Sequence, residues 1–229
     1  YFEIQDYSLI LCCSEHYGRI PFALSFREDS LVQLRSMVRF GMNAVFLHDG
    51  IYLSEAGVQL IPGEIDLCCG DDSVLAPLFR TFADACRTQN LPLCTQTLLC
   101  MLGLGQGLTP SADDRILGFI YAFVRAEPTG VFKTELCRII SELSRERTGA
   151  ISHTYLNAVC ENKEFQLLQN LYESILQKRD LRADIYRLTG VGNTSGKEMV
   201  KGMLLYFGTV HHQKISMEDI YLKYQEGTI

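Results

Sequence analysis

Residues 103–114 read Gly103-Leu104-Gly105-Gln106-Gly107-Leu108-Thr109-Pro110-Ser111-Ala112-Asp113-Asp114. Apolar residues at helical spacing follow this stretch. Glycines permit positive φ angles and a close approach of the backbone to a ligand, and proline suits the first turn of a helix. The pattern therefore predicts a glycine-rich loop that leads into a helix, with Thr109 as the N-cap residue. Free N–H groups at such a helix N-terminus can bind an anion.

Ordinary helix capping is the alternative explanation, because hydroxyls, proline and acidic residues are common where helices begin. Three glycines exceed what capping requires, so we favour a ligand site. The stretch is no P-loop, because no Gly-Lys-Ser/Thr ends it. The dinucleotide-binding fingerprint has a different glycine spacing.

A second loop of the same kind occurs later and reads Thr189-Gly190-Val191-Gly192-Asn193-Thr194-Ser195-Gly196-Lys197-Glu198. Ser111 and Ser195 lie 84 positions apart, and each is followed by an acidic residue three positions on and a glycine seven positions on. We hypothesise that the loops are matching parts of a divergent helical repeat and face one site. Chance similarity is the alternative, because these residue types are common at helix starts.

Two such loops would bind a small ligand that carries both an anionic group and N–H donors. The helix N-termini and the hydroxyls would hold the anion, with Arg115, Lys197 and Arg147 as the candidate cations. Asp113 and Asp114 would orient N–H groups or hold a divalent ion, for which Mg²⁺ is the candidate. The sequence assigns no cofactor and no metal-ligand set.

The distribution of apolar residues changes along the chain. Residues 1–72 contain short β-type segments, including a hairpin signal at Asp49-Gly50, whereas residues 73–229 show helical spacing. We expect helices near 93–102, from the glycine loop to Ala126, and after Ser152 as a cap. The sequence predicts an α+β fold, with a β-rich N-terminal domain (1–72) packed on a mainly α-helical domain (73–229).

The composition narrows the class of protein. Hydrophobic residues make up 47% and charged residues 21%, and the formal net charge is −6, which argues against nucleic-acid binding. No apolar run reaches the ~18 residues of a membrane span. Nine cysteines without C-x-x-C spacing fit buried thiols in a reducing compartment. We expect a cytoplasmic protein and regard a homo-oligomer as a candidate assembly.

Residues 103–114 resemble the G-L-G-x-G-L-T-P-S-G-D-D signature of the AllH-like family, a bacterial family of unknown function that also carries a carboxylase label. The middle motif of that family resembles Ile151-Ser152-His153-Thr154-Tyr155-Leu156, and its last motif resembles residues 192–198. This chain has Ala112 where the family signature has glycine. It has Glu198 where the family has an aspartate that is presumed to be an acid of the site. The resemblance covers most of the chain from about residue 20.

The resemblance implies a subunit of a carbamoyltransferase in purine and allantoin breakdown, which interconverts oxalurate plus phosphate with oxamate plus carbamoyl phosphate and needs partner subunits. A non-catalytic subunit or sensor that binds a small anion or nucleotide, and a carboxylase, are the alternatives. The catalytic candidates are Asp113, Asp114 and Ser195. The substrate-binding candidates are Gly105, Gly107, Thr109, Ser111, Ser152, Asn193, Thr194 and Gly196.

Overall fold

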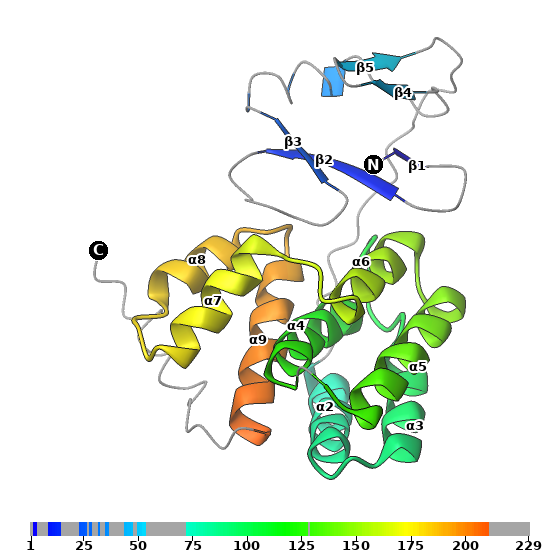
Figure 1. Cartoon of the computed structure of the whole chain (residues 1–229), viewed down its shortest axis with the longest axis vertical. Coiled ribbons are helices and arrows are strands. Elements are labelled where there is room, and N and C mark those ends of the chain that lie inside the picture. The colour runs from blue at the N-terminus through cyan, green and yellow to red at the C-terminus, as the bar shows by residue number, and fades with distance from the viewer. Residues whose placement is uncertain are drawn as a thin grey trace. The chain divides into compact units, whose positions relative to one another are not determined.

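The chain forms two compact units in the computed structural model, Tyr1–Cys68 and Cys69–Ile229. The structure describes residues 72–127 and 129–210, and earlier in the chain five strands and residues 28, 32, 35 and 36 (Figure 1). The sequence also predicts a helix at Ser216-Met217-Glu218-Asp219, which is close to a capping box, and an extended segment at Val58-Gln59-Leu60-Ile61. Both lie outside these described residues.

The first unit contains short strands in two small sheets. One sheet has the order β1-β2-β3, in which β1 pairs antiparallel with β2, and β2 pairs parallel with β3. The other pairs β4 with β5 antiparallel, so that Leu47 lies opposite Gly50. The strand bounds are β1 Phe2–Glu3, β2 Leu9–Ser14, β3 Ala23–Phe26, β4 Ala44–Leu47 and β5 Gly50–Leu53.

The second unit is built from helices that follow one another with short connections. Helices near 93–102 and from the glycine loop to Ala126 are confirmed, with bounds that differ by one or two residues at some ends. The bounds are α2 Asp72–Arg87, α3 Leu91–Met101, α4 Ser111–Ala126, α5 Val131–Arg147, α6 Ala150–Cys160, α7 Gln166–Leu176, α8 Arg182–Thr189 and α9 Ser195–Thr209.

The predicted α+β fold class is wrong. The part of the chain described without long gaps, residues 72–127 and 129–210, is all-helical, with eight helices and no strand. The β-type alternation before residue 72 yields strands of only two to six residues. Such short pieces do not supply the sheet layer on which helices pack in an α+β domain.

Helix α4 is the core of the helical unit. Every residue from Ser111 to Val124 is buried, because α4 packs against α9, α6 and α7. Large aromatic side chains surround its middle, and the ring of Phe119 meets those of Phe82 and Tyr206. A helix that is buried on all sides cannot show a clear polar face, which explains why polar residues at its start are buried as well.

Helices α4 and α9 cross with their backbones in direct contact (Figure 1). A Cβ atom on Gly118 would lie 2.0 Å from the carbonyl oxygen of Met199, and one on Gly202 would lie 2.0 Å from that of Arg115. Gly118 and Gly202 lie 84 positions apart in the sequence, as do Arg115 and Met199. Residues of α4 and their counterparts 84 positions later in α9 thus swap places between the two contacts, with the same offset as Ser111 and Ser195. Such reciprocal contacts are the pattern of a local twofold relation between the helices.

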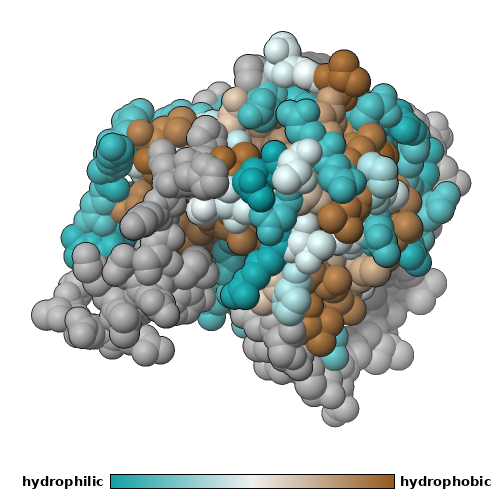
Figure 2. All heavy atoms as spheres, turned by 90° about the horizontal axis from the view of Figure 1, so that it is seen from below, coloured by the Kyte–Doolittle hydropathy of each residue, from teal (hydrophilic) through white to brown (hydrophobic). Residues whose placement is uncertain are grey.

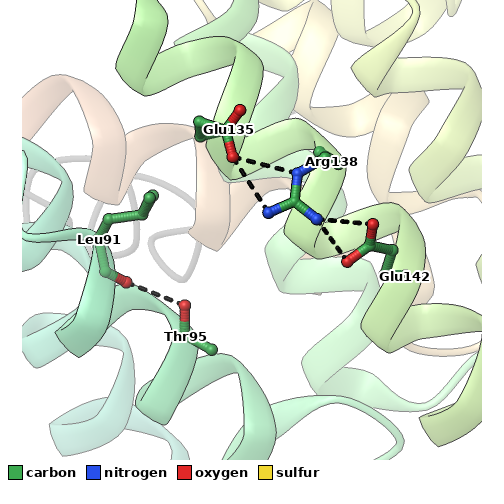
Figure 3. Close-up of polar contacts among 5 residues, drawn as sticks. All are labelled: Leu91, Thr95, Glu135, Arg138 and Glu142. Carbon is green, nitrogen blue, oxygen red and sulfur yellow. Dashed lines mark hydrogen bonds and ion pairs between the residues drawn. The ribbon is translucent and has the colours of Figure 1, made fainter.

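The surface of the helical unit carries exposed ion pairs among mixed polar and apolar residues (Figure 2). The face drawn in Figure 2 mixes hydrophilic and hydrophobic residues. On α5, the guanidinium of Arg138 lies between Glu135 and Glu142, with 2.7 Å from Nη1 to Glu142 Oε1 (Figure 3). These pairs are exposed, so they contribute little to stability. Among the described residues of the helical unit, five cysteines are free, of which Cys86 and Cys94 are buried.

Candidate functional site

The glycine loop between α3 and α4 needs its glycines for two different reasons. Gly103, Gly105 and Gly107 all have positive φ angles, of 80°, 125° and 93°. A Cβ on Gly103 would lie 2.2 Å from the Arg147 carbonyl oxygen, and one on Gly105 would lie 2.6 Å from the Ser111 nitrogen. Gly107 has open space around it. The loop is thus fixed at its base and exposed at its tip.

The N-terminus of α4 differs from the prediction. Thr109 is not the N-cap residue, because Pro110 takes that position and no side chain caps the helix. The proline favours an extended conformation for Thr109. Thr109 Oγ1 instead lies 3.0 Å from Oγ of Ser195, the first residue of α9.

This hydrogen bond brings the two predicted loops together. Thr109 and Ser195 lie 86 positions apart, yet their hydroxyls are in direct contact. Helix α9 also begins without a side-chain cap, since Thr194 holds the N-cap position and makes no such bond. Two helix N-termini without side-chain caps therefore meet at one place, where their dipoles favour an anion. In the first turns, the N–H groups of Ala112 and Gly196 already donate to the carbonyl oxygens of Leu104 and Val191.

Asp114 is the buried acid at this meeting point. Its side chain is 2% exposed, and its Oδ2 has no hydrogen-bond partner among the described residues. Burial raises the pKa of Asp114 from 3.8 to about 7, while the hydroxyls of Ser195 and Thr109 oppose the rise. The charges of Asp113 and Glu198 raise this pKa further. Asp114 can thus change protonation state near neutral pH.

Asp113 has a different environment, although it is the adjacent residue. Its Oδ1 accepts a hydrogen bond of 2.8 Å from the Gly103 amide, and its Oδ2 accepts one from the Thr148 hydroxyl. Burial raises the pKa of Asp113, and these hydrogen bonds oppose the rise. Both carboxyl oxygens are therefore engaged, and Asp113 ties the glycine loop to the junction of α5 and α6.

The junction of α5 and α6 supplies the third helix start beside the loop. Helix α6 begins after Gly149, without a side-chain cap, and a Cβ on Gly149 would lie 3.6 Å from the Leu108 carbonyl oxygen. Ser152 does not cap this helix, because it lies within the first turn, buried, with no hydrogen-bond partner for Oγ among the described residues. The neighbouring His153 is a structural residue, since its Nδ1 lies 2.8 Å from Ser144 Oγ.

Glu198 is not a free acid of the site, although the AllH-like family has a presumed site aspartate at this position. Its Oε2 accepts a 2.6 Å hydrogen bond from Arg115 Nε, and its Oε1 lies 2.8 Å from Lys201 Nζ. Arg115 is itself buried and stacks over the Phe79 ring. The predicted role of Arg115 as a cation for the ligand is therefore replaced by a buried ion pair between α4 and α9.

The remaining candidates fall around the same place with different exposure. Lys197 is exposed on the first turn of α9, while Arg147 donates to the Leu99 carbonyl oxygen at 2.9 Å. Gly196 is buried, and a Cβ there would lie 1.8 Å from the Leu188 carbonyl oxygen, so it serves packing. The other positions are buried Ser111, exposed Gly105, Gly107 and Asn193, and partly exposed Thr194.

Sequence reasoning missed Thr148 and Lys201, which complete the surroundings of Asp113 and Glu198. Thr148 could have been found from the Thr148-Gly149 pair, because this pair interrupts two helical patterns. Nothing in the sequence marked Lys201 as a partner of Glu198. A magnesium site stays a prediction. The described residues contain no group of three or more histidine, cysteine, aspartate or glutamate side chains placed to hold a metal ion.

The comparison with protein families identifies the segment that carries this site. Residues 101–207 match the model of a family described as "Oxamate carbamoyltransferase subunit AllH". The chain is similar to this family over these residues. No significant match was found to a curated protein or to a solved structure.

The description of this family names one subunit of an oxamate carbamoyltransferase. The matched residues include both loops, all of α4 and most of α9. Among the helices that the structure describes, each is too short or too polar to cross a membrane.

Proposed function

We propose that this chain is the AllH-type subunit that binds the small anionic substrates of oxamate carbamoyltransferase where α4 and α9 begin. The reaction interconverts oxalurate plus phosphate with oxamate plus carbamoyl phosphate. The observation that carries the proposal is the 3.0 Å contact between Thr109 Oγ1 and Ser195 Oγ beside the buried carboxyl of Asp114. All three residues lie within the segment that matches the family.

The chemistry of the substrates fits the groups at this site. Each substrate carries a carboxylate or a phosphate, which the uncapped N-termini of α4 and α9 can bind through backbone N–H groups. Oxamate, oxalurate and carbamoyl phosphate also carry N–H groups, for which the hydroxyl and carboxyl oxygens are acceptors. The subunit would raise the rate by orienting the carbamoyl carbon and stabilising the charge that develops on its oxygen.

The glycine loop would form the rim of this site. Its tip is open, and the side chain of Leu108 is 73% exposed, which is unusual for a leucine beside a polar site. A surface of this kind fits coverage by a partner subunit of the transferase, which would exclude water from the substrates.

The test is thermal unfolding of the full chain with phosphate, carbamoyl phosphate, oxalurate or oxamate, with and without Mg²⁺. A ligand at about 100 times its Kd adds roughly 2.7 kcal/mol to the free energy of unfolding. We expect Ser195→Ala to lose most of this ligand-dependent shift. Thr95→Ala is the matched control, because the Thr95 hydroxyl bonds only to the Leu91 carbonyl oxygen of its own helix (Figure 3).

Carbamoyl transfer is then measured for the chain alone and with the subunits that co-purify with it. Binding without transfer under either condition would identify a non-catalytic binding subunit instead. An equal shift in Ser195→Ala and the original chain would place the ligand elsewhere and overturn the proposed site.

A further inference from the structure

We propose that Asp114 moves the proton during carbamoyl transfer through its unpartnered Oδ2, and that Asp113 only positions the glycine loop. This division of roles between two adjacent aspartates rests on the proposed function of the site. It adds to that function the identity of the acid and the atom that it uses.

The hydrogen bonds of the two carboxyls separate the roles. Asp113 has both oxygens engaged, by the Gly103 amide of the glycine loop and by the Thr148 hydroxyl. Asp114 is equally buried, at 2% exposure, but its Oδ2 has no partner in the described part of the chain. A buried polar oxygen without a partner is costly unless it serves a ligand or carries a proton.

The position of Asp114 places its carboxyl group beside the proposed substrate site. The hydroxyls of Thr109 and Ser195, which mark where the two loops meet, act on the Asp114 carboxyl and on each other. A substrate held at the N-termini of α4 and α9 would therefore contact the same carboxyl. The Asp113 carboxyl instead accepts a hydrogen bond from Thr148, at the junction of α5 and α6.

The charged groups that face Asp114 come from two helices. On α4 the neighbour is Asp113, and on α9 it is Glu198, both of which favour the neutral form of Asp114. Arg115 and Lys201 bind Glu198 and limit its effect. On α6, Ser152 acts on Asp113, and the pKa of His153 is lowered by burial and by Arg145. The surroundings thus keep Asp114 protonated up to a pH of about 7.

The proton balance of the reaction requires one such group. An oxygen of HPO₄²⁻ attacks the carbamoyl carbon of oxalurate, the bond from that carbon to the inner nitrogen breaks, and its electron pair stays on the nitrogen of oxamate. Asp114 gives its proton to that nitrogen and takes the proton from the attacking phosphate. The products are oxamate and carbamoyl phosphate, and Asp114 ends protonated, so the reverse reaction uses the same residue in the same state.

The experiment compares Asp114→Asn with Asp113→Asn in the full chain, assayed together with its co-purifying subunits. We expect Asp114→Asn to lower kcat by about 10²–10⁴-fold while oxamate still binds. We also expect it to remove the fall of kcat as pH rises through about 7. Asp113→Asn should lower thermal stability and keep that pH profile. Asp114→Glu should restore part of kcat.

A second measurement covers the case in which the Asp114 variants do not fold. The Asp114 carboxyl carbon is followed by NMR in the original chain, assigned through its own backbone amide, with and without oxamate. We expect a titration near pH 7 that moves to higher pH when oxamate binds, because a second negative charge disfavours the carboxylate.

The outcomes separate this inference from the function on which it rests. If the original complex transfers no carbamoyl group, the proposed function fails and this role fails with it. If the complex is active but Asp114→Asn keeps its kcat and pH profile, only the role of Asp114 is overturned. An NMR titration of Asp114 that oxamate leaves unchanged has the same meaning.

Discussion

Asp113 and Asp114 show how one residue type takes two roles in adjacent positions. Consecutive side chains on a helix point about 100° apart, so the two carboxyls of α4 face different neighbours. Asp113 meets two hydrogen-bond donors, whereas Asp114 meets two hydroxyls and the carboxylate of Glu198. The sequence predicted both as site acids and could not distinguish them, because the direction of each depends on how α4 packs.

The protonation of Asp114 predicts how stability changes with pH. Its pKa is raised from 3.8 to about 7 on folding, so the folded state holds a proton that the unfolded state releases above pH 4. The stabilisation is complete below pH 4 and is lost as pH rises toward 7. When the pH rises from 5 to 8, the ionisation of Asp114 alone should lower the free energy of unfolding by roughly 3 kcal/mol.

Urea unfolding at pH 5 and pH 8 measures this loss. Asp114→Asn, which cannot titrate, should show a pH dependence smaller by that amount. Asp84→Asn on α2, where the carboxylate is exposed, is the control and should leave the pH dependence unchanged. An equal pH dependence in the original chain and Asp114→Asn would contradict the raised pKa.

The ion pair between Arg115 and Glu198 predicts a strong effect of removing one charge. Both side chains are almost fully buried, and Lys201 shares the Glu198 carboxylate. Glu198→Gln leaves a buried guanidinium without its counter-charge, which should cost about 3–5 kcal/mol in the free energy of unfolding. The measurement is urea unfolding at pH 7.

Glu142→Gln on α5 is the matched control for that variant. Its partner Arg138 is in solvent, so the loss of the pair should change stability little (Figure 3). If the two variants proved equally stable, the buried pair would not join α4 to α9 as the structure shows.

At the scale of the helices, the spacing of apolar residues predicted most elements but not their contacts. The helical period identified α4 and its end at Ala126, because Pro128 and Gly130 interrupt the pattern. It missed α8, which has only eight residues and few apolar ones. The glycine seven positions after each serine was noticed as a repeat, and its physical reason is the close crossing of α4 and α9.

This crossing predicts that Gly118 accepts no side chain. In Gly118→Ala the new methyl group would lie 2.0 Å from a backbone carbonyl oxygen, which cannot rotate away as a side chain could. We expect a loss of about 1–3 kcal/mol or more in the free energy of unfolding. Gly202→Ala should behave alike, because its contact with the Arg115 carbonyl oxygen is the counterpart.

Gly208→Ala on α9 provides the control, because no described atom beyond the adjoining backbone of its own helix lies within 4 Å of the added methyl group. Alanine favours the helix over glycine, so this variant should be as stable as the original or more stable by about 0.5–1 kcal/mol. Thermal unfolding of the three variants measures the difference. A Gly118→Ala protein as stable as Gly208→Ala would show that the helices do not approach so closely.

At the scale of the whole molecule, local patterns predicted the site better than the fold class. The two loops were found because glycine, hydroxyl and acidic residues are rare together, and they do meet at Thr109 and Ser195. The α+β class was wrong because alternating apolar residues show only that a segment can be extended. They do not show that the strands extend into a sheet that could support the helices.

The division of the chain leads to the last prediction. All residues of the proposed site lie in the second unit, Cys69–Ile229, and the family match lies there as well. Helices α6, α7 and α9 of this unit bury α4 from several sides. The contacts among α2 to α9 are made within this unit. A fragment of residues 69–229 should therefore fold cooperatively and bind oxamate with the affinity of the full chain.

Circular dichroism and thermal unfolding of this fragment, with and without oxamate, check the prediction. The helical signal should melt in one transition, and oxamate should raise its midpoint in the fragment and in the full chain alike. Ser195→Ala in the fragment should lose the ligand effect and keep the transition. A fragment that folds without binding oxamate, while the full chain binds it, would mean that the first unit contributes to the site. A fragment that shows no cooperative transition would mean that the second unit depends on the first for its stability.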